Sequence, residues 1–134
     1  MVRAQDLGGN RDSNVIEKSD TTGDISYAGQ VAPLFTNYCT GANCHSGAMP
    51  QENLSLANAA TAYTNLVNKP STRCPSDPRV LPTKPDQSYL YWKLIGMSVG
   101  GGCFQGARMP PGGMFTAGEI NPIRGWIAAG APNN

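Results

Sequence analysis

Apolar side chains recur at helical spacing in four stretches of the chain, which predicts four amphipathic helices. The first stretch covers residues 31–38 and ends at Cys39, and Pro33 fits it only in the first turn. The second is ended by Lys69-Pro70, and the third by the glycines at 100–102. The apolar positions are Val31, Leu34, Phe35 and Tyr38; Ala59, Tyr63, Leu66 and Val67; Leu90, Leu94 and Met97; and Ile120, Ile123 and Ile127.

Polar residues at the starts of two stretches indicate where the helices begin. Ser88 is placed as the N-cap of the third helix, and Thr116 with Glu119 forms a capping box for the fourth. Pro122 conflicts with a regular fourth helix, because a proline inside a helix removes a hydrogen bond. It predicts a bend, or a start one turn later at Asn121.

Loops make up much of the rest, since the 134 residues include 16 glycines and 11 prolines. Residues 1–28 are polar and without period, so they predict an arm rather than a core, and residues 29–134 predict one domain. Leu54 and Leu56 alternate around Ser55 as if lining a pocket. The expected fold is all-α, with three to five short helices in a loop-rich frame.

Charge and hydropathy exclude several classes of function. Charged residues are 14% of the chain and the formal net charge is +1, so nucleic acid is not an expected partner. No apolar stretch is long enough to cross a membrane. The N-terminus carries no apolar signal segment.

The chemistry of the chain is concentrated in Cys39-Thr40-Gly41-Ala42-Asn43-Cys44-His45. Two thiols followed directly by a histidine predict one covalently attached haem, because each thiol adds to a vinyl group and the imidazole binds the iron. The usual spacing has two residues between the cysteines, whereas this sequence has four. Gly41 and its small neighbours are expected to let the loop bulge.

Two other interpretations of the same cysteines stay open. A structural zinc site would combine Cys39, Cys44 and His45 with Cys74 or Cys103, although adjacent residues strain to reach one tetrahedral ion. A disulfide between Cys39 and Cys44 would leave His45 unexplained. A cysteine protease is excluded, because it needs a histidine remote from its nucleophile and His45 is the only histidine.

Cys74 and Cys103 remain after the haem motif, and both stand in loop sequences. This even remainder predicts a disulfide between them, with two free buried thiols as the alternative. A disulfide indicates an oxidising compartment. Covalent haem attachment is also expected outside the cytoplasm, so we predict a periplasmic or extracellular protein whose export signal is not in this chain.

The second axial ligand is expected to be a methionine, since the chain has no second histidine. Met109 stands in Arg-Met-Pro-Pro-Gly-Gly, where prolines stiffen the backbone and glycines allow close approach to a ring. Met114 is the alternative. Met97 is expected in the core, and Met49 follows His45 too closely to reach the other face of a haem. Arg73, Arg79 and Lys84 are candidate partners for haem propionates, with a solvated surface position as the alternative for each.

Together these residues resemble a class I c-type cytochrome, and more narrowly the cytochrome c domain first described from planctomycetes. The resemblance covers about residues 30–132, from the helix before the haem motif to Trp126-Ile127 in the last helix. It implies a cytochrome c-like fold around one haem c, with His45 and Met109 as axial ligands. The activity that it implies is electron transfer rather than catalysis, with redox proteins as partners.

Two further expectations concern assembly and the alternative function. Two alternatives stay open for the arm: it wraps on its own domain, or Val15, Ile16, Ile25 and Tyr27 join it to a neighbouring copy of the chain, and head-to-tail contacts of this kind give rings or filaments. Alternatives to a free carrier are a haem enzyme or gas sensor with an open iron site, or a module that docks onto a dehydrogenase.

Overall fold

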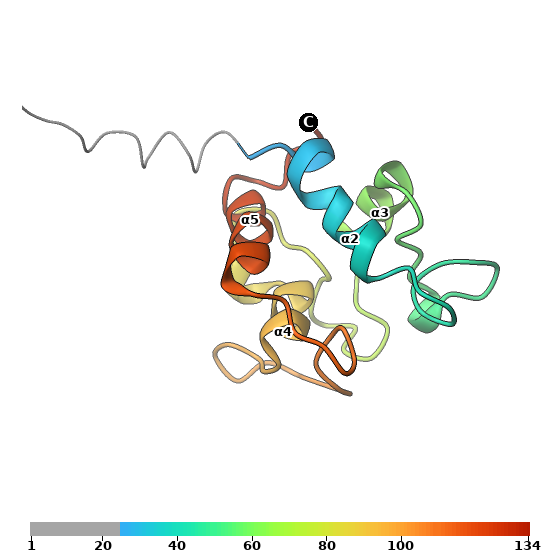
Figure 1. Cartoon of the computed structure of the whole chain (residues 1–134). Coiled ribbons are helices and arrows are strands. Elements are labelled where there is room, and N and C mark those ends of the chain that lie inside the picture. Colours follow the sequence, from blue (N-terminus) through green and yellow to red (C-terminus); the bar gives the residue numbers. More distant parts are fainter. Residues whose placement is uncertain (1–24) are drawn as a thin grey trace, which may run out of the picture.

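The computed structural model describes residues 25–134, and the regular structure of this part is helical (Figure 1). These residues form no β-strand, and two isolated bridges join Val67 to Val80 and Pro70 to Pro78. The predicted all-α class is therefore confirmed for the described residues. The α-helices are α2 (Ala32–Tyr38), α3 (Ala59–Leu66), α4 (Tyr89–Ile95) and α5 (Ala117–Ala128), with a π-helical turn at Tyr27–Val31 and 3-10 turns at Gln51–Asn53 and Pro85–Gln87.

The helix before the haem motif forms as its periodicity predicts. Val31 and Phe35 are buried in the core, and Pro33 lies in the first turn of α2. Tyr38, the last apolar position, differs because it is 49% exposed and packs edge-on against Phe115. The apolar stripe therefore leaves the core at the C-terminal end of α2, next to Cys39.

The last helix begins at Ala117, so the predicted start at Asn121 is wrong. The capping box is present, and Thr116 N donates to Glu119 Oε1 at 2.8 Å. Pro122 lies inside α5, where a proline costs about 3 kcal/mol. Full burial of Ile123, Trp126 and Ile127 stabilises by about 1.5 to 3 kcal/mol for each side chain, which exceeds that cost.

The helix that begins after Ser88 follows expectation at its start and departs from it at its end. Ser88 occupies the N-cap position of α4 as predicted, but its buried hydroxyl makes no capping bond; it donates to Lys84 O at 2.9 Å and accepts from Leu81 N at 2.9 Å. Met97 is 62% exposed, which corrects its expected place in the core. Gly96 adopts a left-handed conformation with φ +88° and ends the helix, so Met97 falls beyond the apolar stripe.

The two ends of the described chain meet beside α5 (Figure 1). Ala28 N donates to Asn134 O at 2.9 Å, and the Tyr27 ring stacks on Trp126 with centroids 5.0 Å apart. Tyr27 is 1% exposed and fills the core of its own chain, so for this residue the structure favours packing on its own domain over a contact between copies. Assembly through Val15 and Ile16 lies outside the described residues and stays a prediction.

A glycine in α5 allows the chain before Tyr27 to pack closely on this helix. A Cβ added at Gly125 would lie 2.5 Å from Ile25 Cδ1, which is closer than non-bonded carbon atoms approach each other, so the Ile25 side chain would have to shift. Residues 25–28 thus belong to the packed domain, although the sequence placed them in the arm. No helix in residues 25–134 has the length and apolarity that a membrane crossing requires.

Candidate cofactor-binding site

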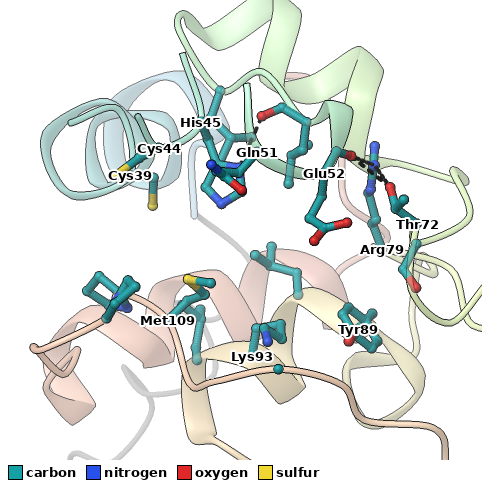
Figure 2. Close-up of a pocket in the computed structure, with 18 of the residues that line it drawn as sticks. Cys39, Cys44, His45, Gln51, Glu52, Thr72, Arg79, Tyr89, Lys93 and Met109 are labelled. Carbon is teal, nitrogen blue, oxygen red and sulfur yellow. Dashed lines mark hydrogen bonds between the residues drawn. The ribbon is translucent and has the colours of Figure 1, made fainter. Parts of the chain in front are cut away.

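A cavity of about 500 Å³ separates two walls of the domain (Figure 2). The upper wall runs from Tyr38 through Leu56 and includes the loop 71–79; the lower wall is α4 with the loop 105–111. This volume lies within the range of about 300 to 1,000 Å³ that is typical of cofactor pockets. Leu54 and Leu56 line the cavity, as the sequence predicted.

The haem motif folds into a tight loop that turns its three functional residues to the cavity. Cys39 ends α2, Cys44 N donates to Gly41 O at 3.0 Å, and His45 N donates to Cys39 O at 3.0 Å. The left-handed residue of the loop is Asn43, with φ +62°, rather than Gly41. Asparagine tolerates this conformation well, so the loop between the two cysteines turns without a left-handed glycine.

The imidazole of His45 is oriented by one backbone group. Nδ1 lies 3.1 Å from Leu54 O, and a carbonyl can only accept, so Nδ1 carries the proton and Nε2 holds the lone pair. Histidines that bind metals usually donate their other ring N–H in this way. The backbone carbonyl of His45 accepts from Leu56 N at 2.7 Å, which holds the residue against the segment that orients its ring.

Both thiols of the motif are free and half-buried, so the structure does not contain the alternative Cys39–Cys44 disulfide. Burial raises the pKa of the Cys39 thiol to about 11, and the neighbouring Cys44 adds to the effect. Cys39 therefore carries its proton at neutral pH. In the net addition of a thiol to a vinyl group, the S–H bond breaks, sulfur bonds to one vinyl carbon and the hydrogen goes to the other, which gives a thioether; the thiolate is the more reactive form of the cysteine.

Met109 faces His45 from the lower wall of the cavity (Figure 2). Its backbone N donates to Lys93 O at 2.8 Å, which ties the loop to α4, and the Met109–Pro110 bond is cis. Met114 is 69% exposed, lies outside the cavity lining, and its sulfur accepts from Arg108 Nη1 at 3.3 Å. Of the two methionines considered as ligands, only Met109 lines the cavity.

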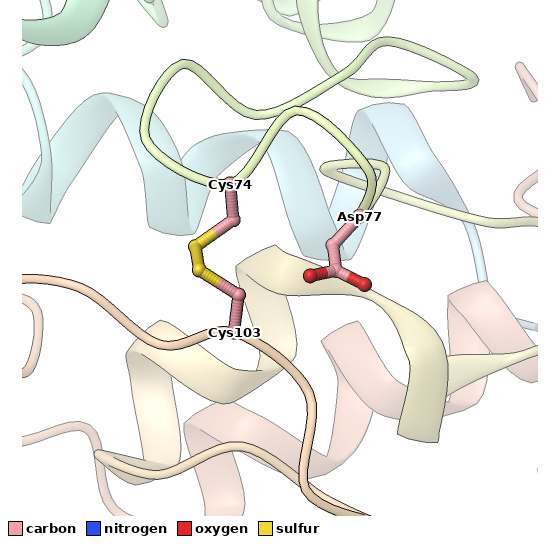
Figure 3. A group of neighbouring side chains, drawn as sticks. All are labelled: Cys74, Asp77 and Cys103. Carbon is pink, nitrogen blue, oxygen red and sulfur yellow. A yellow bond between two sulfur atoms is a disulfide. The ribbon is translucent and has the colours of Figure 1, made fainter.

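A disulfide joins the two walls, between Cys74 of the upper wall and Cys103 of the loop before Met109 (Figure 3). Asp77 lies beside the two sulfurs, but sulfurs bonded to each other are not thiolate ligands, so this cluster is no metal site. The bond also removes the fourth ligand that the alternative zinc site would take from Cys74 or Cys103.

The end of the cavity away from the thiols is polar and cationic. Arg73 and Arg79 line it as the sequence proposed, whereas Lys84 is exposed and lies outside the lining. Lys93 and Glu52 line it too, and sequence reasoning missed both. The signal for Lys93 was its spacing on α4, since it lies one helical turn after Tyr89 and Leu90, which also line the cavity.

Comparison of the chain with protein-family models, with curated proteins and with solved structures gives no match. The functional interpretation of the cavity therefore depends on its own geometry and chemistry.

Proposed function

We propose that this chain is a monohaem c-type cytochrome that carries single electrons. The observation that carries the proposal is the meeting of four residues around one cofactor-sized cavity. Cys39, Cys44 and His45 line one wall, and Met109 lines the wall that faces them. Two thiols, an imidazole and a thioether are the complete set of groups that hold a haem c.

Each residue of this set has a distinct role in the proposal. Cys39 and Cys44 hold the ring covalently through its two vinyl carbons. His45 would hold the iron through Nε2, because Leu54 O keeps the proton on Nδ1. Met109 would hold it through its sulfur, from a loop tied to α4 through Lys93 O.

Two axial ligands from the chain favour electron transfer over catalysis. When bound, the haem supplies an iron that gains and loses one electron. With His45 and Met109 both holding the iron, no open position would be left for a substrate, and the methionine ligand would favour the reduced state. Buried apolar neighbours such as Leu56, Leu66 and Leu94 keep water from the ring.

The fold and the disulfide support the cytochrome c-like assignment and its compartment. An all-α frame in which the first helix ends at the thiols and a later loop brings Met109 to the facing wall fits this family. The disulfide between Cys74 and Cys103 is compatible with an oxidising compartment, either periplasmic or extracellular. Redox proteins are the proposed partners.

The proposal is tested by expressing the chain in a bacterial periplasm together with a cytochrome c maturation system. A pyridine haemochrome spectrum and an intact mass should show one haem that acid-acetone does not extract. A Cys39→Ala, Cys44→Ala variant is the matched control and should lose the covalent haem. A wild-type chain that emerges colourless from the same maturation would refute the proposal.

Binding of carbon monoxide to the reduced protein separates a carrier from an open-site enzyme or sensor. Slow, weak binding is expected, because Met109 has to leave before carbon monoxide can bind. Rapid, tight binding by the wild type would favour the open-site alternative. The Met109→Ala variant gives the positive control, since it should bind carbon monoxide rapidly.

A further inference from the structure

Three cations gather at the polar end of the cavity, and one carboxylate accompanies them. Arg73, Arg79 and Lys93 all line this end, and the carboxylate is that of Glu52. Glu52 Oε2 is paired with Arg73 Nε, which balances one of the three charges. Arg79 and Lys93 form no ion pair among the described residues.

Arg79 is held firmly by neutral groups. Its Nη1 donates to Asn65 O at 2.9 Å, and its Nη2 donates to Glu52 O at 3.1 Å and to Thr72 Oγ1 at 3.0 Å. These acceptors are two backbone carbonyls and a hydroxyl, and none of them carries a charge. They use three of the five guanidinium N–H groups, so two donors have no partner among the described residues.

Lys93 is held in the same way from the opposite wall. Its Nζ donates to Gln105 O at 2.8 Å and lies 4.9 Å from the centroid of the Phe104 ring. A backbone carbonyl and an aromatic face orient the ammonium group without neutralising it. Gly106 leaves room for this group, since a Cβ there would lie 3.3 Å from Nζ.

Partial burial disfavours the charged forms of Arg79 and Lys93. Burial lowers the pKa of Arg79, and burial together with the charge of Arg73 lowers the pKa of Lys93, while the Glu52 carboxylate acts in the opposite direction on both. Glu52 is the one carboxylate of the described residues that lines the cavity, since Asp77, Asp86 and Glu119 lie outside the lining. One carboxylate beside three cations leaves an excess of two positive charges at this half-buried end, which indicates a site for two negative charges.

The order of groups across the cavity indicates which molecule brings those charges. In Figure 2 the sulfurs of Cys39 and Cys44 lie at one end, His45 and Met109 face each other beyond them, and Arg79 lies at the far end. A haem has two vinyl groups at one edge and two carboxylates at the opposite edge. The cavity therefore matches the ring from end to end.

We propose that Arg79 and Lys93 form a dicarboxylate anchor that binds the two propionates of the cofactor, with Arg73 and Glu52 as a neutral pair at its rim. This inference rests on the proposed function and adds residues that the haem motif does not identify. Arg79 takes one carboxylate from the upper wall and Lys93 takes the other from the lower wall. The anchor thus fixes the end of the ring that the thioethers leave free.

The experiment compares the chemical access of the propionates in matured wild-type protein and in an Arg79→Gln, Lys93→Gln variant. Both proteins are treated with a water-soluble carbodiimide and an amine, the thioethers are then cleaved, and the released porphyrin is weighed by mass spectrometry. We expect no label on the wild-type porphyrin and two labels on the variant porphyrin. Equal labelling of the two porphyrins overturns the anchor.

Matched variants separate loss of charge from loss of folding. Lys84→Gln removes one exposed cation outside the cavity and should leave the porphyrin unlabelled. An Arg79→Lys, Lys93→Arg variant keeps both charges and should restore protection. The anchor variant should also have a lower reduction potential than Lys84→Gln, because a cation near the iron disfavours the ferric state. If the Arg79→Lys, Lys93→Arg variant keeps both charges but its propionates are still labelled, the proposal is contradicted.

A free dicarboxylate is the other source of the same chemistry. Matured wild-type protein is titrated with glutarate while its thermal midpoint is followed. No shift in the thermal midpoint is expected, because the propionates already occupy the anchor. A shift that is seen in the wild type and absent from the anchor variant would mean that the anchor binds a free dicarboxylate, and it would overturn the assignment of the two negative charges to the porphyrin. Haem content distinguishes the two failures, since a haem-bearing protein with unprotected propionates contradicts the anchor alone, and a colourless chain contradicts the proposed function as well.

Discussion

The disulfide between Cys74 and Cys103 should contribute a large part of the stability of this domain. The bond closes a loop across 29 residues, and its Cα atoms are 5.8 Å apart. On the chain-entropy model, a loop of this length stabilises the fold by about 3.6 kcal/mol. For a domain of roughly 100 residues, about 4 °C per kcal/mol translates this into a fall of about 14 °C in Tm when the bond is removed.

The perturbation is a Cys74→Ala, Cys103→Ala variant, since alanine keeps the site apolar. Cys74 is 2% exposed and packs with Tyr89 and Trp92, so a serine there would add the cost of a buried hydroxyl. Thermal and urea unfolding are followed by circular dichroism, with and without a thiol reductant. Wild-type protein with reductant should approach the variant, and the reductant should not change the variant further.

Two results would refute this reasoning. A variant within about 1 kcal/mol of the oxidised wild type would mean that the walls are held together without the bond, since such a loss is well below the usual cost of removing a disulfide. A further fall of the variant in reductant would mean that the reductant acts elsewhere. In the proposed haem protein, the absorption band from iron–sulfur bonding adds a local readout, because Cys103 lies in the loop that leads to Met109.

Three further predictions concern the axial ligand, the last helix and the core. Met109→Ala should abolish the iron–sulfur absorption band of the oxidised protein and Met114→Ala should keep it; the reverse pattern would make Met114 the ligand. The hydrogen bond from Thr116 N lowers the pKa of Glu119 in the folded protein. The ionised carboxylate therefore stabilises the fold fully above its ordinary pKa of 4.5, and this stabilisation is lost as the pH falls through the lowered pKa. Urea unfolding at a series of pH values should show this loss in the wild type, and Glu119→Gln should remove it. Ile123→Ala deletes a fully buried side chain and should cost about 2 to 5 kcal/mol in urea unfolding, and a loss under 1 kcal/mol would contradict its place in the core.

The cationic end of the cavity shows where sequence reasoning stopped. Arg73, Arg79 and Lys84 were equal candidates, because a proline-rich loop has no period that tells inward from outward side chains. The structure places Arg73 and Arg79 at the cavity and Lys84 outside it. Lys93 comes from a helix on the facing wall, so its partners become visible only when the two walls are brought together.

Local signals were sufficient for the sequence to predict four helices, the capping box at Thr116 and four residues that the structure brings to one cavity, namely Cys39, Cys44, His45 and Met109. Helical periods, caps and the haem motif depend on neighbours within a few residues, which is why they can be found in a sequence. Tertiary structure alone decided that Tyr27 enters the core, that Met97 leaves it and that Arg79 and Lys93 share one end of a cavity. These outcomes depend on which distant segments pack together, and burial against a distant partner leaves no local pattern in the chain.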